Sequence, residues 1–74
     1  TNLIKKSINL YPNPTNNFIV IDDFDNTKDY EIFDSMGKKV AIIKSRKTDI
    51  TLLESGTYFV KSNGNKVERF SIIK

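Results

Sequence analysis

The sequence contains no cysteine, no histidine and no tryptophan, and its only alanine is Ala41. Without cysteine the chain forms no disulfide, so its fold depends on sheet packing or on attachment to something larger. Histidine is the commonest general base, and histidine and cysteine are common ligands of zinc. Their absence argues against most acid–base and zinc-dependent catalysis, and the scarcity of alanine argues against a helical fold.

Long hydrophobic runs are also missing. No stretch approaches the roughly 18 apolar residues of a membrane-spanning helix, and the first residues lack the basic-then-apolar pattern of a signal peptide. The 12 basic and 9 acidic residues are interleaved and leave a net charge of +3. No basic stripe follows a phosphate backbone, so we expect no nucleic-acid partner. With 74 residues the chain forms one domain with little room for a buried cleft.

What the sequence does contain is a series of short segments rich in Ile, Val, Phe and Tyr, punctuated by Asn, Asp, Gly and Pro. This pattern is typical of strands, and no segment has the spacing of an amphipathic helix. The seven predicted strands cover residues 7–11, 18–21, 30–34, 39–44, 48–53, 57–61 and 66–74. Alternation places pairs of side chains on a shared face, namely Ile8 with Leu10, Tyr30 with Ile32, Val40 with Ile42 and Ile50 with Leu52. Residues 18–21 are continuously apolar, which predicts burial on both faces or a bridge between two layers.

Turn residues separate these strands. Pro12 and Pro14 exclude a central strand between the first two segments, because each lacks a backbone donor. Gly37 suits a tight hairpin that needs a positive φ, Gly56 marks another turn, and Asn63-Gly64 favours a type I′ hairpin. Short strands at close, even spacing predict an all-β fold, a seven-stranded immunoglobulin-like antiparallel β-sandwich.

The acidic loop that contains Asp22, Asp23 and Asp25 is the densest group of oxygen ligands. Calcium prefers six to eight such oxygens, but the loop does not follow the EF-hand pattern. Asp and Asn are also favoured in solvated turns, where their side chains bond to the backbone. We favour the turn and expect no metal, while a calcium site stays an open alternative. Ser55-Gly56-Thr57 has no base beside it, so nucleophilic catalysis is not supported.

The aromatic and basic residues each have two interpretations. Eight aromatic side chains could form a sugar-stacking platform, but most lie in strands beside Ile and Val, which favours core packing. Phe24 and Phe59 are candidate exceptions, and because Tyr58 and Phe59 alternate, one of the two is expected to face away from the core and mark a contact surface. We interpret the basic residues as protection of edge strands rather than a phosphate site; they are Lys38, Lys39, Lys44, Arg46 and Lys47.

Four segments, taken in order and spacing, resemble a known family. They are Tyr11-Pro12-Asn13-Pro14 with the following residues 18–20, the stretch 32–40, the stretch 52–60, and a last strand ending at Lys74. This order resembles the C-terminal sorting domain of the type IX (Por) secretion system over residues 8–74. The chain begins with Thr1, and we expect residues 1–6 to be a linker from an upstream cargo domain and residues 7–74 to be the sorting domain.

The resemblance implies an immunoglobulin-like tail on a larger exported protein, with no catalytic residue, metal or cofactor of its own. Such a tail directs its cargo through the periplasm and an outer-membrane translocon, and a sortase-like peptidase usually removes it. The cargo then reaches the cell surface or is secreted. The site residues that the resemblance carries over are Pro12, Asn13, Pro14, Gly37, Gly56, Tyr58, Phe70, Ser71, Ile72, Ile73 and Lys74.

The last strand has a specific predicted role. If it lies at a sheet edge, its free N–H and C=O groups are available to another protein through strand addition. We hypothesise that the export machinery reads this edge; a weaker alternative places the reading surface on the turns at Gly37 and Asn63. The competing function is a stand-alone adhesion or carbohydrate-binding module, and the missing His and Cys disfavour an enzyme. A weak homodimer formed by strand exchange is a further alternative.

Overall fold

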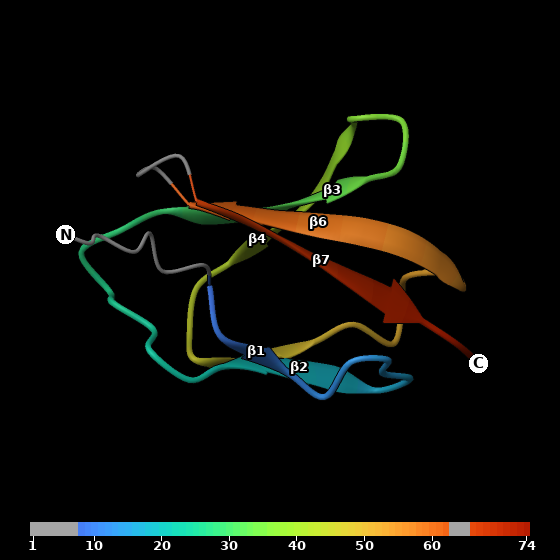
Figure 1. Cartoon of the computed structure of the whole chain (residues 1–74), viewed down its shortest axis with the longest axis horizontal. Coiled ribbons are helices and arrows are strands. Elements are labelled where there is room, and N and C mark those ends of the chain that lie inside the picture. Colours follow the sequence, from blue (N-terminus) through green and yellow to red (C-terminus); the bar gives the residue numbers. More distant parts are fainter. Residues whose placement is uncertain (1–7, 63–65) are drawn as a thin grey trace, which may run out of the picture.

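The computed structural model describes residues 8–62 and 66–74, and all regular secondary structure within these ranges is β-strand. Within the same ranges no helix is long and apolar enough to cross a membrane. The strands form two layers that face each other (Figure 1). They are β1 (Leu10–Tyr11), β2 (Phe18–Ile21), β3 (Tyr30–Asp34), β4 (Lys39–Ile43), β5 (Lys47–Asp49), β6 (Gly56–Ser62) and β7 (Val67–Ile72).

The two sheets have the orders β1-β2-β5 and β4-β3-β6-β7, and all strand pairs are antiparallel. The chain leaves the first sheet after β2, builds the hairpin β3–β4, returns for β5, and ends with the hairpin β6–β7. Pairing of the second strand with the fifth, and of the third with the sixth, is the arrangement of an immunoglobulin-type sandwich. The predicted fold class is therefore confirmed.

The core lies between the sheets and is built mainly from alternate residues of the longer strands. Ile8 and Leu10 are both buried, as are Tyr30 and Ile32, so the faces predicted for these two pairs are confirmed. Full burial of a Val, Leu, Ile or Phe side chain contributes about 1.5–3 kcal/mol to the free energy of folding. The largest fully buried side chains are Phe70, Ile19, Ile21, Ile32, Ile50, Ile72 and Val60.

Strand β2 is buried on both faces, which is one of the two arrangements expected for its continuous apolar sequence. Ile19 and Ile21 face the core, whereas Val20 lies outside the core cluster and is still only 8% exposed. Val20 is flanked by Tyr11 on β1 and Lys47 on β5. The central position of β2 in its sheet therefore buries its outer side.

The prediction for residues 48–53 is wrong at its second half. Strand β5 ends at Asp49, and although Ile50 is buried, Leu52 is 96% exposed. The Asp49 Oδ1 atom accepts hydrogen bonds from the backbone N–H and the hydroxyl of Thr51, and the Leu53 N–H donates to the Ile50 carbonyl. This turn chemistry ends the strand and overrides the apolar alternation that placed Leu52 inward.

Strand β4 also differs from the predicted pattern, because Val40 and Ile42 do not share a face. Lys39 lies opposite Phe33 and Ala41 opposite Ile32, so Val40 is an extra residue in a bulge. Val40 packs against the core, whereas Ile42 is 53% exposed. A bulge shifts the alternation by one residue, and period-two reasoning does not anticipate it.

The turn at Gly37 is formed by a glycine with positive φ and by side-chain hydrogen bonds to the backbone. Gly37 has a φ of +87°, which L side chains rarely adopt, and the Asp34 carboxylate accepts the N–H groups of Met36 and Lys38. The predicted hairpin at Gly37 is confirmed. The Asn63-Gly64 hairpin and the linker at residues 1–6 lie outside the described residues.

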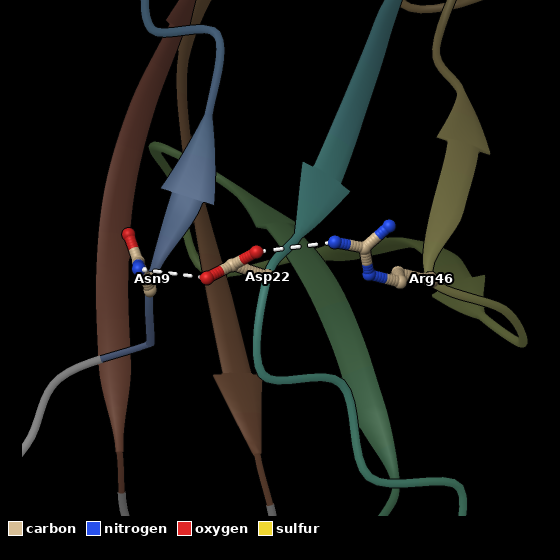
Figure 2. Close-up of polar contacts among 3 residues, drawn as sticks. All are labelled: Asn9, Asp22 and Arg46. Carbon is tan, nitrogen blue, oxygen red and sulfur yellow. Dashed lines mark hydrogen bonds and ion pairs between the residues drawn. The ribbon is translucent and has the colours of Figure 1, made fainter.

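Asp22 connects the strands of the smaller sheet at the end of β2. Its carboxylate lies 3.1 Å from the Arg46 guanidinium and accepts a 3.5 Å hydrogen bond from the Asn9 side chain (Figure 2). The backbone N–H of Asp22 donates to the Asn9 carbonyl. Both charged groups are half exposed, so the ion pair contributes at most about 1 kcal/mol. Asp22 therefore has a structural role at this end of the sheet.

Candidate functional site

The segment between β1 and β2 crosses beside the outer edge of β7, and Asn13 connects the two. Its side-chain amide donates to the Arg69 carbonyl over 3.2 Å, and its side-chain oxygen accepts the Ser71 N–H at 3.0 Å. A carboxamide carries one donor and one acceptor in the geometry of a peptide group. Asn13 therefore pairs with β7 as a backbone unit of a neighbouring strand would.

Thr15 continues this pairing with its own backbone. Its N–H donates to the Ser71 carbonyl and its carbonyl accepts the Ile73 N–H, both at 2.9 Å, which forms an isolated parallel bridge with β7. Thr15 is 5% exposed, and its hydroxyl donates to the Phe18 carbonyl over 2.6 Å. The side chain thus closes the turn that leads into β2 while the backbone holds the end of β7.

The outer edge of β7 is consequently covered along its second half. β7 is an edge strand of the larger sheet, as the strand-addition hypothesis requires. Its outward polar groups from the Arg69 carbonyl to the Ile73 N–H already have partners in Asn13 and Thr15. Covering an edge with a loop is a common way to prevent unwanted strand pairing. An incoming strand would have to displace the crossing segment before it could pair here.

A second cluster ties the start of β6 to the end of the chain. The Tyr58 hydroxyl donates to the Glu54 carbonyl at 2.8 Å, four residues upstream, as in the tyrosine corner of immunoglobulin-like domains. The Tyr58 ring stacks on Phe70 with 5.8 Å between the ring centroids. The Lys74 N–H donates to the Ser55 hydroxyl, and the Lys74 ammonium donates to the Thr51 carbonyl at 2.7 Å.

These contacts gather most of the predicted site residues at one end of the sandwich, where β7 finishes (Figure 1). Phe70 and Ile72 are 1% exposed and belong to the core, whereas Ile73 is 60% exposed. Gly56 opens β6 opposite Ile72 with a φ of +157° and so lies in the strand rather than in a turn. Gly37 does not take part; it occupies the tip of the β3–β4 hairpin, with nothing within 4 Å of an added Cβ.

Three residues of this end escaped the sequence reasoning: Thr15, Thr51 and Ser55. Each contacts the C-terminal strand or its end through hydroxyl or backbone groups of a loop, and nothing in a short polar stretch indicates a partner more than 15 residues away. The surface that results is a shallow groove lined by Pro12, Pro14, Thr15, Asn16, Asn17, Phe18 and Ile73.

A family model described as a secretion system C-terminal sorting domain, that of the type IX (Por) system, matches residues 9–74. The chain belongs to this family. Searches of curated proteins and of solved structures found no significant match. The chain is thus a type IX secretion sorting signal, which implies a cargo protein, a secretion machinery and export to the cell surface or beyond. Membership of this family also indicates a non-catalytic tail.

The acidic side chains of two loops form hydrogen bonds within their own turns. The described residues contain no group of three or more metal-ligating side chains. In the loop proposed as a calcium alternative, Asp25 accepts hydrogen bonds from the hydroxyl and the N–H of Thr27, and these bonds lower the pKa of its carboxyl. Thr51 lowers the pKa of Asp49 in the same way. Both carboxylates close turns; the sequence favoured this interpretation for the loop with Asp25, whereas it placed Asp49 within a strand.

Proposed function

We propose that this sorting domain carries its cargo across the outer membrane by presenting its C-terminal end to the translocon. The supporting observation is the convergence of residues 12–15 with residues 69–74, which are more than 50 positions apart in sequence. Neither segment makes this surface alone, so the signal is readable only when the domain is folded. In this proposal the cargo passes through the periplasm first.

The proposed reading surface is the assembled end and not a bare strand edge. The strand-addition hypothesis needs unpaired N–H and C=O groups on β7, and Asn13 and Thr15 already occupy those from the Arg69 carbonyl to the Ile73 N–H. What this end presents to a partner is Ile73, Lys74 and the groove beside Pro12 and Pro14. An exposed isoleucine next to a rigid, partly apolar groove suits recognition by shape.

We also propose that a sortase-like peptidase removes the domain at or before residues 1–6, where a linker would leave the folded part intact. Cleavage there requires no unfolding of β1 to β7. The mass of a displayed cargo, measured with this chain at its C-terminus, tests the position. A mass that includes residues beyond 6 would contradict it.

The export test uses a reporter with a signal peptide and this chain at its C-terminus, in a bacterium that has the type IX system. Ile73→Ser is expected to lower surface display several-fold, because it removes an exposed apolar contact without touching the core. Met36→Ser is the matched control, since Met36 is 90% exposed at the tip of the β3–β4 hairpin. Surface substitutions of this kind alter stability by within about 0.5 kcal/mol, which thermal unfolding verifies.

The outcomes separate the two candidate reading surfaces. Loss of display with Ile73→Ser alone supports the C-terminal end. Loss with Met36→Ser alone would move the reading surface to the hairpin that contains Gly37. Normal display of both variants would show that neither surface is read, and failure of the unaltered chain to export the reporter would refute the export role itself.

A further inference from the structure

The larger sheet has one face turned away from the core, which we call the outer face. Phe33 on β3 lies directly opposite Phe59 on β6, and in the same row Lys39 lies on β4 and Arg69 on β7. Residues directly opposite each other in antiparallel strands project to the same side. Since Tyr58 packs in the core, Phe59 faces outward, which confirms that one of these two aromatic residues is turned away from the core.

A second row runs beside the first across the same four strands. Glu31 lies between Ile42 on β4 and Lys61 on β6, and Lys61 lies opposite Val67 on β7. Ile42 and Val67 are 53% and 46% exposed. Each strand of this sheet therefore contributes one apolar side chain to the outer face, although the solvent side of an antiparallel sheet is ordinarily polar.

The charges on the outer face are mostly positive. Lys39, Lys61 and Arg69 lie in these two rows, and their single acidic residue, Glu31, is already paired with Lys39 at 3.4 Å. The Lys61 ammonium lies 5.0 Å above the centre of the Phe33 ring, in cation–π contact. The result is an apolar strip across four strands with cations on either side of it.

Sheet stability alone does not account for this arrangement. A cross-strand phenylalanine pair stabilises a sheet by up to about 1 kcal/mol, and lysine on an edge strand discourages aggregation. Those two effects explain Phe33, Phe59 and Lys39. They do not explain why Ile42 and Val67, one on each edge strand, are also apolar and about half exposed. An extended apolar patch with a charged rim is typical of a docking surface.

We infer that the outer face docks an acidic protein surface of the export machinery, one that places an apolar side chain on Phe33 and Phe59 and carboxylates on Lys61 and Arg69. This inference rests on the proposed export function and adds a second contact to the C-terminal end. Charge complementarity identifies the occupant. A second copy of this chain would bring like charges together if it used the same face, which is unfavourable.

A protein fits the outer face better than a membrane does. Phe33 and Phe59 lie in the two central strands and are only partly exposed, and the Lys61 ammonium lies over the Phe33 ring. A flat anionic bilayer would meet the ammonium groups but would not reach these rings. A partner side chain can displace the Lys61 ammonium toward a carboxylate and then contact the ring that it covered.

The binding test uses three probes on the 74-residue chain, followed by amide chemical shifts. The first is a synthetic peptide of alternating glutamate and phenylalanine, the second is the same peptide with lysine in place of glutamate, and the third is a phosphatidylglycerol vesicle. We expect the acidic peptide alone to shift the amides of Phe33, Phe59 and Lys61. Arg69→Glu is expected to weaken that binding about tenfold, the ratio that corresponds to about 1.4 kcal/mol. Lys28→Glu is the control, because it changes the net charge equally from a loop outside the two rows.

The same variants are then measured in the reporter export assay, with Phe59→Thr as the apolar probe. We expect Arg69→Glu and Phe59→Thr to lower export while Lys28→Glu leaves it unchanged and all three unfold cooperatively. Equal binding of both peptides, binding of the vesicle alone, or binding of none of the three overturns the inference, as does normal export of Arg69→Glu and Phe59→Thr. Those results leave the proposed export function standing, because it is tested independently by Ile73→Ser and by the unaltered chain.

Discussion

Replacing Asn13 by alanine tests whether its side chain serves as a strand surrogate for β7. The change removes two hydrogen bonds, one to the Arg69 carbonyl and one from the Ser71 N–H. A typical intramolecular hydrogen bond contributes about 0.5–1.5 kcal/mol. Both partners lie at an exposed sheet edge where water can replace the side chain, so we expect a total near the lower end, about 1–2 kcal/mol. For a domain of this size that lowers the melting temperature by about 4–15 °C.

The assay combines urea unfolding with amide hydrogen exchange. In Asn13→Ala the Ser71 amide loses its acceptor and is expected to exchange faster, while the Thr15 and Ile73 amides keep their backbone partners. Asn16→Ala is the matched control, because Asn16 is an exposed asparagine in the same crossing with no side-chain hydrogen bond among the described contacts. Equal stability of the two variants, together with unchanged exchange at Ser71, would refute the surrogate role.

Four further substitutions test other parts of the structure. Tyr58→Phe removes the hydrogen bond from the Tyr58 hydroxyl to the Glu54 carbonyl and should lower the free energy of unfolding in urea by about 1 kcal/mol. An unchanged free energy would mean that this hydrogen bond does not stabilise the fold. Ile50→Ala should lower the free energy of unfolding by about 2–5 kcal/mol, whereas Leu52→Ala should change it by less than about 0.5 kcal/mol. A larger loss for Leu52→Ala than for Ile50→Ala would instead support the longer strand predicted from the sequence. Hydrogen bonds from Thr51 lower the folded-state pKa of Asp49, so the stability that this carboxylate contributes is present above about pH 4 and is lost as the pH falls through the folded pKa. Between about pH 5 and pH 2, the melting temperature of Thr51→Val should therefore fall less than that of the unaltered chain. An equal fall in both proteins would contradict this linkage.

The two errors in the strand predictions have a common physical origin. Alternation of apolar residues assumes that a strand continues at a fixed period of two. At Asp49 a side chain forms competing hydrogen bonds to Thr51 and ends the strand. At Val40 an extra residue shifts the period and turns Ile42 outward. In both places a turn or a bulge of one or two residues overrode the apolar alternation of a segment of about six residues.

The candidate site was only partly predictable for a different reason. The resemblance identified Pro12, Asn13 and Pro14 as significant, and their sequence excluded a central strand. It did not indicate that the Asn13 side chain bonds to a segment 56 and 58 residues away. That pairing exists because two sheets pack face to face and bring the crossing segment beside the edge of β7.

The sequence by itself determined what depends on near neighbours: strand-forming segments, the inward side of most of them, the positive φ at Gly37 and membership of the sorting-domain family. These follow from steric preferences and from a side-chain period that acts within a few residues. Only the tertiary structure decided which strands pair across the fold, that the last strand is covered, and that Phe33 and Phe59 meet on an open face. Contacts between distant segments require closed loops and a shared core, and no local pattern encodes where those loops close.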